Sequence, residues 1–241
     1  MTTPRVFVIR HGETEWSLNG RHTGITELPL TANGEKRIRA TGRALIGDDR
    51  LIVPRNLAHI YVSPRKRAQR TLELLEVGCA EKLPWEERRK HAENGIRTSA
   101  KVEITEDIRE WDYAAGLPEW DIWRDGCPDG ESPEQVTERV DALISDIRSK
   151  YHGPVIGKDK KDAGPGDVLI VAHGHILRAF AMRWVGKTLQ DGPTFLLEAG
   201  GVGTLSYEHK SLEEPAILLG GAFMVDVVEN SVEGEREKEG K

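Results

Sequence analysis

The chain has 241 residues, of which 38% are hydrophobic, and its 34 basic and 40 acidic side chains give a net charge of −6. This length suits one large or two small domains, and the acidic balance argues against a general nucleic-acid binder, which needs a basic surface for phosphate contacts. No apolar run approaches the roughly 18 residues of a membrane span, and residues 1–10 lack the apolar core of a signal peptide, so we expect a cytoplasmic protein without membrane contact.

Three short apolar runs are predicted to be β-strands. They are VFVIR at residues 6–10, HIYVS at residues 59–63 and DVLIVAH at residues 167–173. All are rich in β-branched residues, and the last is apolar on both faces, which is typical of central strands in a covered, largely parallel sheet.

Helical patterns lie between these strands. Residues 31–46 begin with a capping threonine, residues 64–77 begin with a proline after a serine, and residues 132–151 begin with Ser-Pro followed by an apolar stripe. A fourth helix is predicted at residues 175–185. Strands that alternate with helices predict an α/β fold, a three-layer sandwich whose mostly parallel central sheet has helices on both faces.

The remaining segments are predicted to be loops or a tail. Residues 86–101 are charged, and residues 153–167 (GPVIGKDKKDAGPGD) have the composition of a loop. Neither marks a domain boundary, so we expect a single domain over residues 1–228, followed by an acidic, disordered tail at residues 229–241. Cys79 and Cys127 lack CxxC spacing, which favours free thiols over a disulfide or a metal site.

Two of the predicted strands end in a histidine that is followed by a glycine. In an open α/β sheet, ligands bind beyond the carboxyl ends of the strands, and His11 and His173 both lie there. We expect Gly12 and Gly174 to let a ligand oxygen approach backbone amides. A single histidine at a strand end is more often structural, but two such histidines favour a site.

The third strand leads into a basic segment, SPRKRAQRT, at a predicted helix start. Cations beside helix-terminal amides make an anion site, although such a cluster alone is usually a solvated surface. The convergence at one sheet edge favours a phosphate site made by Arg10, His11, Arg67 and His173, with Arg65 and Lys66 at the same edge.

Four motifs occur in a specific order: RHGETEW, SPRKRAQRT, IREWDY and VAHGHILR. Together they resemble the histidine phosphatase superfamily, in its phosphoglycerate-mutase-like branch, over most of residues 5–225. The stretches EWSLNGRHTGITELPLT, IWRDGCPDGES, AGGVGTLSYEH and EEPAILL are most similar to fungal sugar-bisphosphatases of the sedoheptulose 1,7-bisphosphatase kind.

This resemblance implies a reaction and the residues that perform it. His11 would be the nucleophile that forms a phosphohistidine, and Arg10, Arg67 and His173 would clamp the phosphoryl oxygens. Glu110 would protonate the leaving oxygen and then activate water. The implied activity is hydrolysis of a phosphomonoester, such as a sugar phosphate or bisphosphate, without metal or cofactor. The expected partner is therefore a small phosphorylated metabolite, and a homo-oligomer remains open.

The resemblance also implies substrate contacts, each with a simpler alternative. Ser17, Thr23 and Gly24 fall where the family contacts phosphate, but a polar turn explains them as well. Arg178 would reach a second phosphate or a sugar hydroxyl, or else it lies on a helix surface. Gly174 is the last of the expected substrate contacts.

Two groups of neighbouring residues leave further alternatives open. The acids that compete with Glu110 for its role are Glu106, Asp107 and Asp112. The tryptophans near the predicted site are expected to pack in the core or a lid, although packing on the face of a sugar substrate stays open; they are Trp16, Trp111, Trp120 and Trp123.

Two departures from the family pattern concern the substrate. Arg70 replaces the usual glutamine or histidine, which suggests a more basic pocket, and the YAAGLPEW segment after the acid is short. In the family this segment helps to close the pocket. A short segment favours hydrolysis over mutase chemistry, because a mutase must keep water from the phosphohistidine. Phosphoglycerate mutase activity and a non-catalytic phosphate-ligand binder remain the alternatives.

Overall fold

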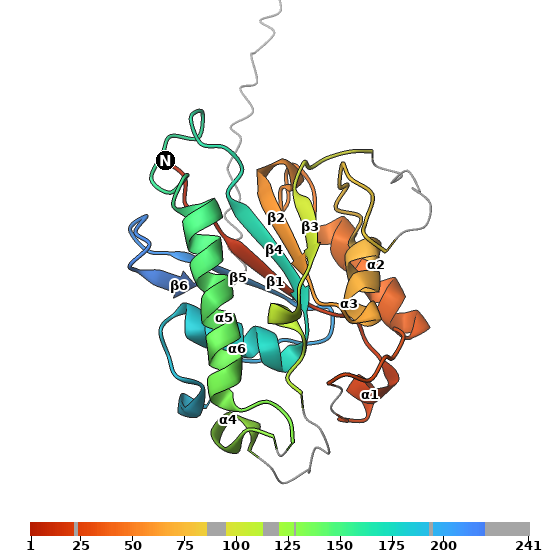
Figure 1. The fold of residues 1–241 in the computed structure, drawn as a ribbon. Coiled ribbons are helices and arrows are strands. Elements are labelled where there is room, and N and C mark those ends of the chain that lie inside the picture. The colour runs from red at the N-terminus through yellow and green to blue at the C-terminus, as the bar shows by residue number, and fades with distance from the viewer. Residues whose placement is uncertain (22–23, 86–94, 113–120, 128, 193–194, 220–241) are drawn as a thin grey trace, which may run out of the picture.

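A mixed β-sheet forms the centre of the computed structural model (Figure 1). The structure describes residues 1–21, 24–85, 95–112, 121–127, 129–192 and 195–219. Within these ranges the strand order is β3-β2-β4-β1-β5-β6. The strands are β1 (Val6–Arg10), β2 (Leu57–Val62), β3 (Lys101–Ile104), β4 (Asp167–Ala172), β5 (Val202–Tyr207) and β6 (Pro215–Ile217). Strands β3, β2, β4 and β1 run parallel, whereas β5 is antiparallel to β1 and β6 to β5, so the predicted mostly parallel sheet is confirmed.

Helices cover both faces of this sheet. The described helices are α1 (Glu15–Leu18), α2 (Ala32–Leu45), α3 (Lys66–Leu75), α4 (Ile122–Asp125), α5 (Pro133–Ile147) and α6 (Gly174–Trp184). Alternate residues of β1 belong to two separate cores: Val6 and Val8 share one buried cluster with residues of α5 and α6, and Phe7 and Ile9 share another with residues of α2 and α3. The three-layer α/β sandwich predicted from the sequence is therefore confirmed.

The predicted helix starts are capped as the sequence indicates. The Thr31 hydroxyl accepts a hydrogen bond from the Gly34 amide at the start of α2. At the start of α5, Ser132 and Gln135 cap each other's backbone amides, and Pro133 occupies the first turn. These side chains satisfy backbone donors that a helix leaves unpaired at its amino end.

Several segments differ from the predictions or lie outside the described residues. The predicted charged loop at residues 86–101 is in part wrong, because Thr98 and Ala100 are buried and Lys101 opens β3. Residues 153–166 form turns, as expected, and the predicted tail at 229–241 is outside the described residues. In the described part of the chain, no helix combines the length and the apolar character needed to cross a bilayer.

The parallel strands place three polar residues together at one edge of the sheet. His11 follows β1, Ser63 follows β2 and His173 follows β4. Because β1, β2 and β4 run in the same direction, their carboxyl ends meet at this edge. The candidate site is built there.

Candidate active site

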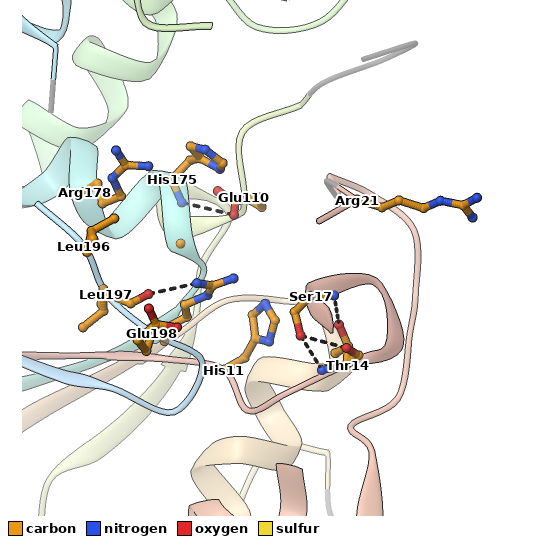
Figure 2. A pocket seen from close by; sticks show the side chains of 12 residues that line it. His11, Thr14, Ser17, Arg21, Glu110, His175, Arg178, Leu196, Leu197 and Glu198 are labelled. Carbon is orange, nitrogen blue, oxygen red and sulfur yellow. Dashed lines mark hydrogen bonds between the residues drawn. The ribbon is translucent and has the colours of Figure 1, made fainter. Parts of the chain in front are cut away.

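His11 lies at the base of a pocket at the carboxyl edge of the sheet (Figure 2). Its side chain is buried, and Nδ1 is 2.8 Å from the Gly12 carbonyl oxygen. A carbonyl oxygen can only accept, so Nδ1 carries the proton and Nε2 of the neutral ring keeps its lone pair. Burial first, and then the positive charge of Arg67, lower the pKa of His11 to about 3. The ring is therefore neutral at ordinary pH, with the lone pair of Nε2 free to act.

His173 and Arg67 lie fully buried beside His11. The two imidazole rings lie 5.0 Å apart, centre to centre. Arg67 Nε donates to His173 Nδ1 at 3.2 Å, so the proton of the neutral ring is on Nε2, which donates to Ser63 Oγ at 2.6 Å. Burial and the neighbouring Arg67 hold the pKa of His173 well below its usual range. The positive charge beside His11 therefore comes from Arg67 rather than from the histidines.

Arg67 is fixed by the loop that follows α1. Its Nη1 and Nη2 groups donate to the carbonyl oxygens of Thr26 and Gly24, at 2.8 and 3.2 Å. Arg67 is fully buried, whereas Arg65 pairs with Glu27 at 3.5 Å and Lys66 is exposed. Of the three basic residues predicted at this edge, the structure brings Arg67 to the histidines.

Arg10 supplies a second positive charge from the end of β1. Its Nη1 group donates to the Leu197 carbonyl oxygen at 2.9 Å, and its buried Nε has no hydrogen-bond partner among the described residues. A side chain on Gly174 would bring a Cβ within 3.2 Å of Nε and 3.3 Å of Cζ of Arg10. Gly174 therefore gives the guanidinium room to lie across the start of α6.

Glu110 reaches the same pocket from the segment after β3 (Figure 2). Its carboxylate is buried, and it accepts backbone hydrogen bonds from Trp111 and Ile176 at 3.0 Å and from His175 at 3.3 Å. Burial raises the pKa of Glu110, and these amides offset only part of that rise. A carboxyl group of this kind can donate a proton nearer to neutral pH than an exposed glutamate.

The predicted substrate contacts after β1 have different positions. Ser17 lines the pocket, where its hydroxyl donates to the Thr14 carbonyl oxygen at 2.7 Å (Figure 2). Gly24 contributes the carbonyl that holds Arg67. Thr23 is outside the described residues.

Arg178 and Arg21 line the outer part of the pocket. The Arg178 guanidinium lies over the Trp123 ring, with Cζ 5.1 Å from the ring centre, and the same ring lies 5.7 Å from the ring of His175. Trp123 thus packs against two residues that line the pocket, and it also packs against the core, as expected. In the described residues, no cluster of three or more histidine, cysteine or acidic side chains is placed to hold a metal ion.

Two expectations about this site are wrong. The Gly12 amide donates to Thr71 Oγ1 at 3.0 Å, and a side chain on Gly12 would collide with Ile38, so this glycine serves packing rather than an approaching ligand. Arg70 is not in the pocket, because Glu35 and Glu73 both bind its guanidinium at 2.7 Å. The pair of carboxylates neutralises the charge that was expected to make the pocket more basic.

Other residues of the site were missed in the sequence. Ser63 is predicted as the last residue of a strand and the residue before a helix, without a role in the site; Leu197 acts through its backbone carbonyl, and the Thr71 hydroxyl, in the middle of α3, accepts from the Gly12 amide. The position of Ser63 at the end of a predicted strand could have identified it as a site residue. Nothing local in the sequence identifies a carbonyl such as that of Leu197.

Comparisons with known proteins show which family this chain is similar to. The family model described as histidine phosphatase superfamily (branch 1) matches residues 6–215. Sedoheptulose 1,7-bisphosphatase of Saccharomyces cerevisiae is 32% identical over 284 aligned positions, which cover 97% of this chain and 98% of the yeast protein. An acid phosphatase of Mycobacterium tuberculosis is 32% identical over 216 positions, with 85% of this chain and 87% of that protein covered.

A solved structure shares the fold. The mycobacterial glucosyl-3-phosphoglycerate phosphatase superposes with a TM-score of 0.62 over 90% of this chain and 97% of that chain. The two sequences are 20% identical, so the similarity concerns the fold alone.

Proposed function

Because the chain belongs to the histidine phosphatase superfamily, branch 1, we propose that it hydrolyses a sugar phosphate or sugar bisphosphate through a phosphohistidine on His11. The family and its phosphatase-named relatives make the chain a phosphoric monoester hydrolase. One observation carries the proposed mechanism: the Nδ1–H of His11 is held by the Gly12 carbonyl, which leaves the Nε2 lone pair for attack.

In the first step, Nε2 of His11 attacks phosphorus and the bond from phosphorus to the leaving oxygen breaks. Arg10 and Arg67 lie close enough to His11 to lower its pKa, and their positive charges stabilise the negative charge of the phosphoryl group during transfer. Because the arginines are already held by the Leu197 and Thr26 carbonyls, little reorganisation is needed when phosphate binds.

Glu110 acts in both steps, first as an acid and then as a base. Its raised pKa suits a protonated carboxyl that donates to the leaving oxygen as that oxygen departs. The resulting carboxylate then takes a proton from water, and the water oxygen attacks phosphorus, which releases inorganic phosphate and restores neutral His11. Protons and charges balance over the cycle.

The outer pocket supports a substrate with a second polar or anionic group. Arg178 and Arg21 line it beyond the phosphate-binding residues. The 32% identity to the yeast sedoheptulose 1,7-bisphosphatase over nearly the whole chain favours sugar bisphosphates over other phosphate esters.

A panel of phosphorylated metabolites, scored by release of inorganic phosphate, tests this function. We expect sedoheptulose 1,7-bisphosphate and fructose 1,6-bisphosphate to release phosphate fastest. The matched comparison is 3-phosphoglycerate with a trace of its 2,3-bisphosphate. Conversion of that isomer without free phosphate would establish mutase chemistry instead, and binding without turnover of any ester would leave a binding protein.

The close packing of Gly174 on Arg10 predicts a sensitive position. Gly174→Ala should lower kcat/KM for phosphate release by about ten- to a hundredfold, because the new methyl group displaces the guanidinium by a few tenths of an ångström or more. Steady-state kinetics check this result. Gly164→Ala is the matched control, since a Cβ at that position meets open space. Equal kinetics for the two variants would show that the position of Arg10 does not limit the reaction.

A further inference from the structure

The segment that carries Glu110 has little regular structure of its own. It follows β3 and a short 3-10 turn, Glu106–Ile108, and residues 109–112 belong to no helix or strand. A proton donor must be held within a fraction of an ångström of its working position. The position of this carboxylate must therefore be set by contacts from elsewhere in the fold.

One buried residue, Glu131, contacts this segment on both sides of Glu110. Its carboxylate accepts from Arg109 Nη2 at 2.6 Å and from the Asp112 amide at 3.1 Å. Its backbone carbonyl accepts from the Trp111 indole at 2.9 Å, and its amide donates to the Asp112 carbonyl at 3.2 Å. Three of the four positions in residues 109–112 are thus tied to a single residue.

Arg139 of α5 links these contacts to the core. Its guanidinium binds the Glu131 carboxylate through Nε and Nη2, both at 2.9 Å, and its Nη1 donates to the Asp107 carbonyl at 2.6 Å and the Arg109 carbonyl at 3.2 Å. The side chains of Glu131 and Arg139 are 9% and 10% exposed. The neighbouring helix positions Val136 and Val140 are fully buried, so α5 is a rigid support for this pair.

Gly130 allows the close approach that these contacts need. A side chain there would place a Cβ 2.1 Å from the Asp112 carbonyl oxygen, which no packing can accommodate. The chain before Glu131 therefore lies directly against the segment that carries Glu110.

A buried ion pair is a poor source of stability, because desolvation of the two charges offsets most of their attraction. Such a pair does fix the relative position of its two side chains, because a planar guanidinium and a carboxylate bind each other through parallel hydrogen bonds. We propose that the Glu131–Arg139 pair positions Glu110 for proton transfer to the leaving oxygen. This inference rests on the proposed role of Glu110, and Glu131 and Arg139 are positioning residues that act through it.

The test compares two substrates that differ in their need for an acid. An alkyl phosphate such as glycerol phosphate has a poor leaving group, whereas p-nitrophenyl phosphate releases a stable anion that needs no proton. Glu131→Gln and Arg139→Lys should each lower kcat/KM for the alkyl ester by about ten- to a hundredfold and change kcat/KM for the nitrophenyl ester by less than about threefold.

Asp167→Asn is the matched control. It breaks another largely buried ion pair, Arg5–Asp167 at 3.0 Å, which lies at the opposite end of β4 from His173. We expect it to lower the unfolding temperature without preference between the two substrates. Equal losses on both substrates in the Glu131 and Arg139 variants would overturn the proposal.

A second pair of measurements separates this proposal from the proposed function. Glu131→Gln added to Glu110→Gln should have no further effect on the alkyl ester, since both changes remove the same contribution, and additive losses would contradict the inference. Absence of a substrate preference in Glu110→Gln itself would instead refute the acid assignment.

Hydrogen exchange tests the positioning role without turnover. It should be faster at the amides of residues 109–112 in Glu131→Gln than in the wild type, and unchanged in the middle of α5. Unchanged exchange at residues 109–112 would refute the positioning role.

Discussion

Replacing His11 by alanine is expected to abolish phosphate release, with kcat/KM lower by about four to six orders of magnitude, as removal of a catalytic nucleophile costs in other enzymes. The change removes the Nε2 lone pair but leaves both arginines in place, so phosphate esters should still bind. Phosphate release by the purified variant, and labelling of the wild type by a phosphate ester to give an acid-labile, alkali-stable adduct, measure the two consequences.

The matched control is His152→Gln at the other end of the sheet. His152 is also fully buried, burial also lowers its pKa to about 3, and its Nδ1 lies 2.6 Å from the Tyr207 hydroxyl. This variant should lose stability and keep its turnover at a permissive temperature. Comparable activity in His11→Ala and the wild type would end the proposal of a phosphohistidine.

The low pKa of His11 also predicts the shape of the pH profile. Because this pKa lies at about 3, His11 stays neutral when the pH falls from 7 to 5. A loss of kcat/KM in that range must therefore come from another group, such as the phosphate ester itself.

The second large effect is expected at Glu110. Glu110→Gln should lower kcat/KM for alkyl phosphates by about two to four orders of magnitude, because the amide cannot protonate the leaving oxygen. The loss for p-nitrophenyl phosphate should be much smaller. Activity of the wild type on alkyl phosphates should fall as the pH rises past the raised pKa of Glu110, since the acid must be protonated, and this fall should be absent in the variant.

Asp112→Asn distinguishes Glu110 from its neighbouring acid. Asp112 contacts Glu131 through its backbone amide and carbonyl, which asparagine retains. We therefore expect a small effect on either substrate. A larger, leaving-group-dependent loss in Asp112→Asn than in Glu110→Gln would mean that the wrong carboxylate has been assigned.

The strands that are buried on both faces were predictable, whereas the edge strands β3 and β6 and the neighbouring β5 were not. VFVIR and DVLIVA are continuous apolar runs, which identify β1 and β4 in any context. By contrast, β3 is KVEI with mostly exposed side chains, and β5 alternates small and polar residues with apolar ones. The pairing of such strands depends on neighbours that are distant in the sequence.

The same distinction applies to the candidate site. The positions of His11, Arg10, Arg67 and His173 could be predicted because each lies at or just beyond the end of a recognisable strand. The contacts of Arg70 could not, because its carboxylate partner Glu35 comes from a different helix. The catalytic roles stay predictions that the experiments above address.

His11 and Glu110 have unequal structural support. His11 follows β1, which is hydrogen-bonded to β4 on one side and β5 on the other, whereas Glu110 follows β3 at the edge of the sheet. Local opening starts more easily at an edge strand than at a central one. In a variant that lacks the Glu131–Arg139 pair, mild heat or denaturant should therefore release the Glu110 segment first, and protein in that state would accept a phosphoryl group from a reactive ester and stall with that group still on His11.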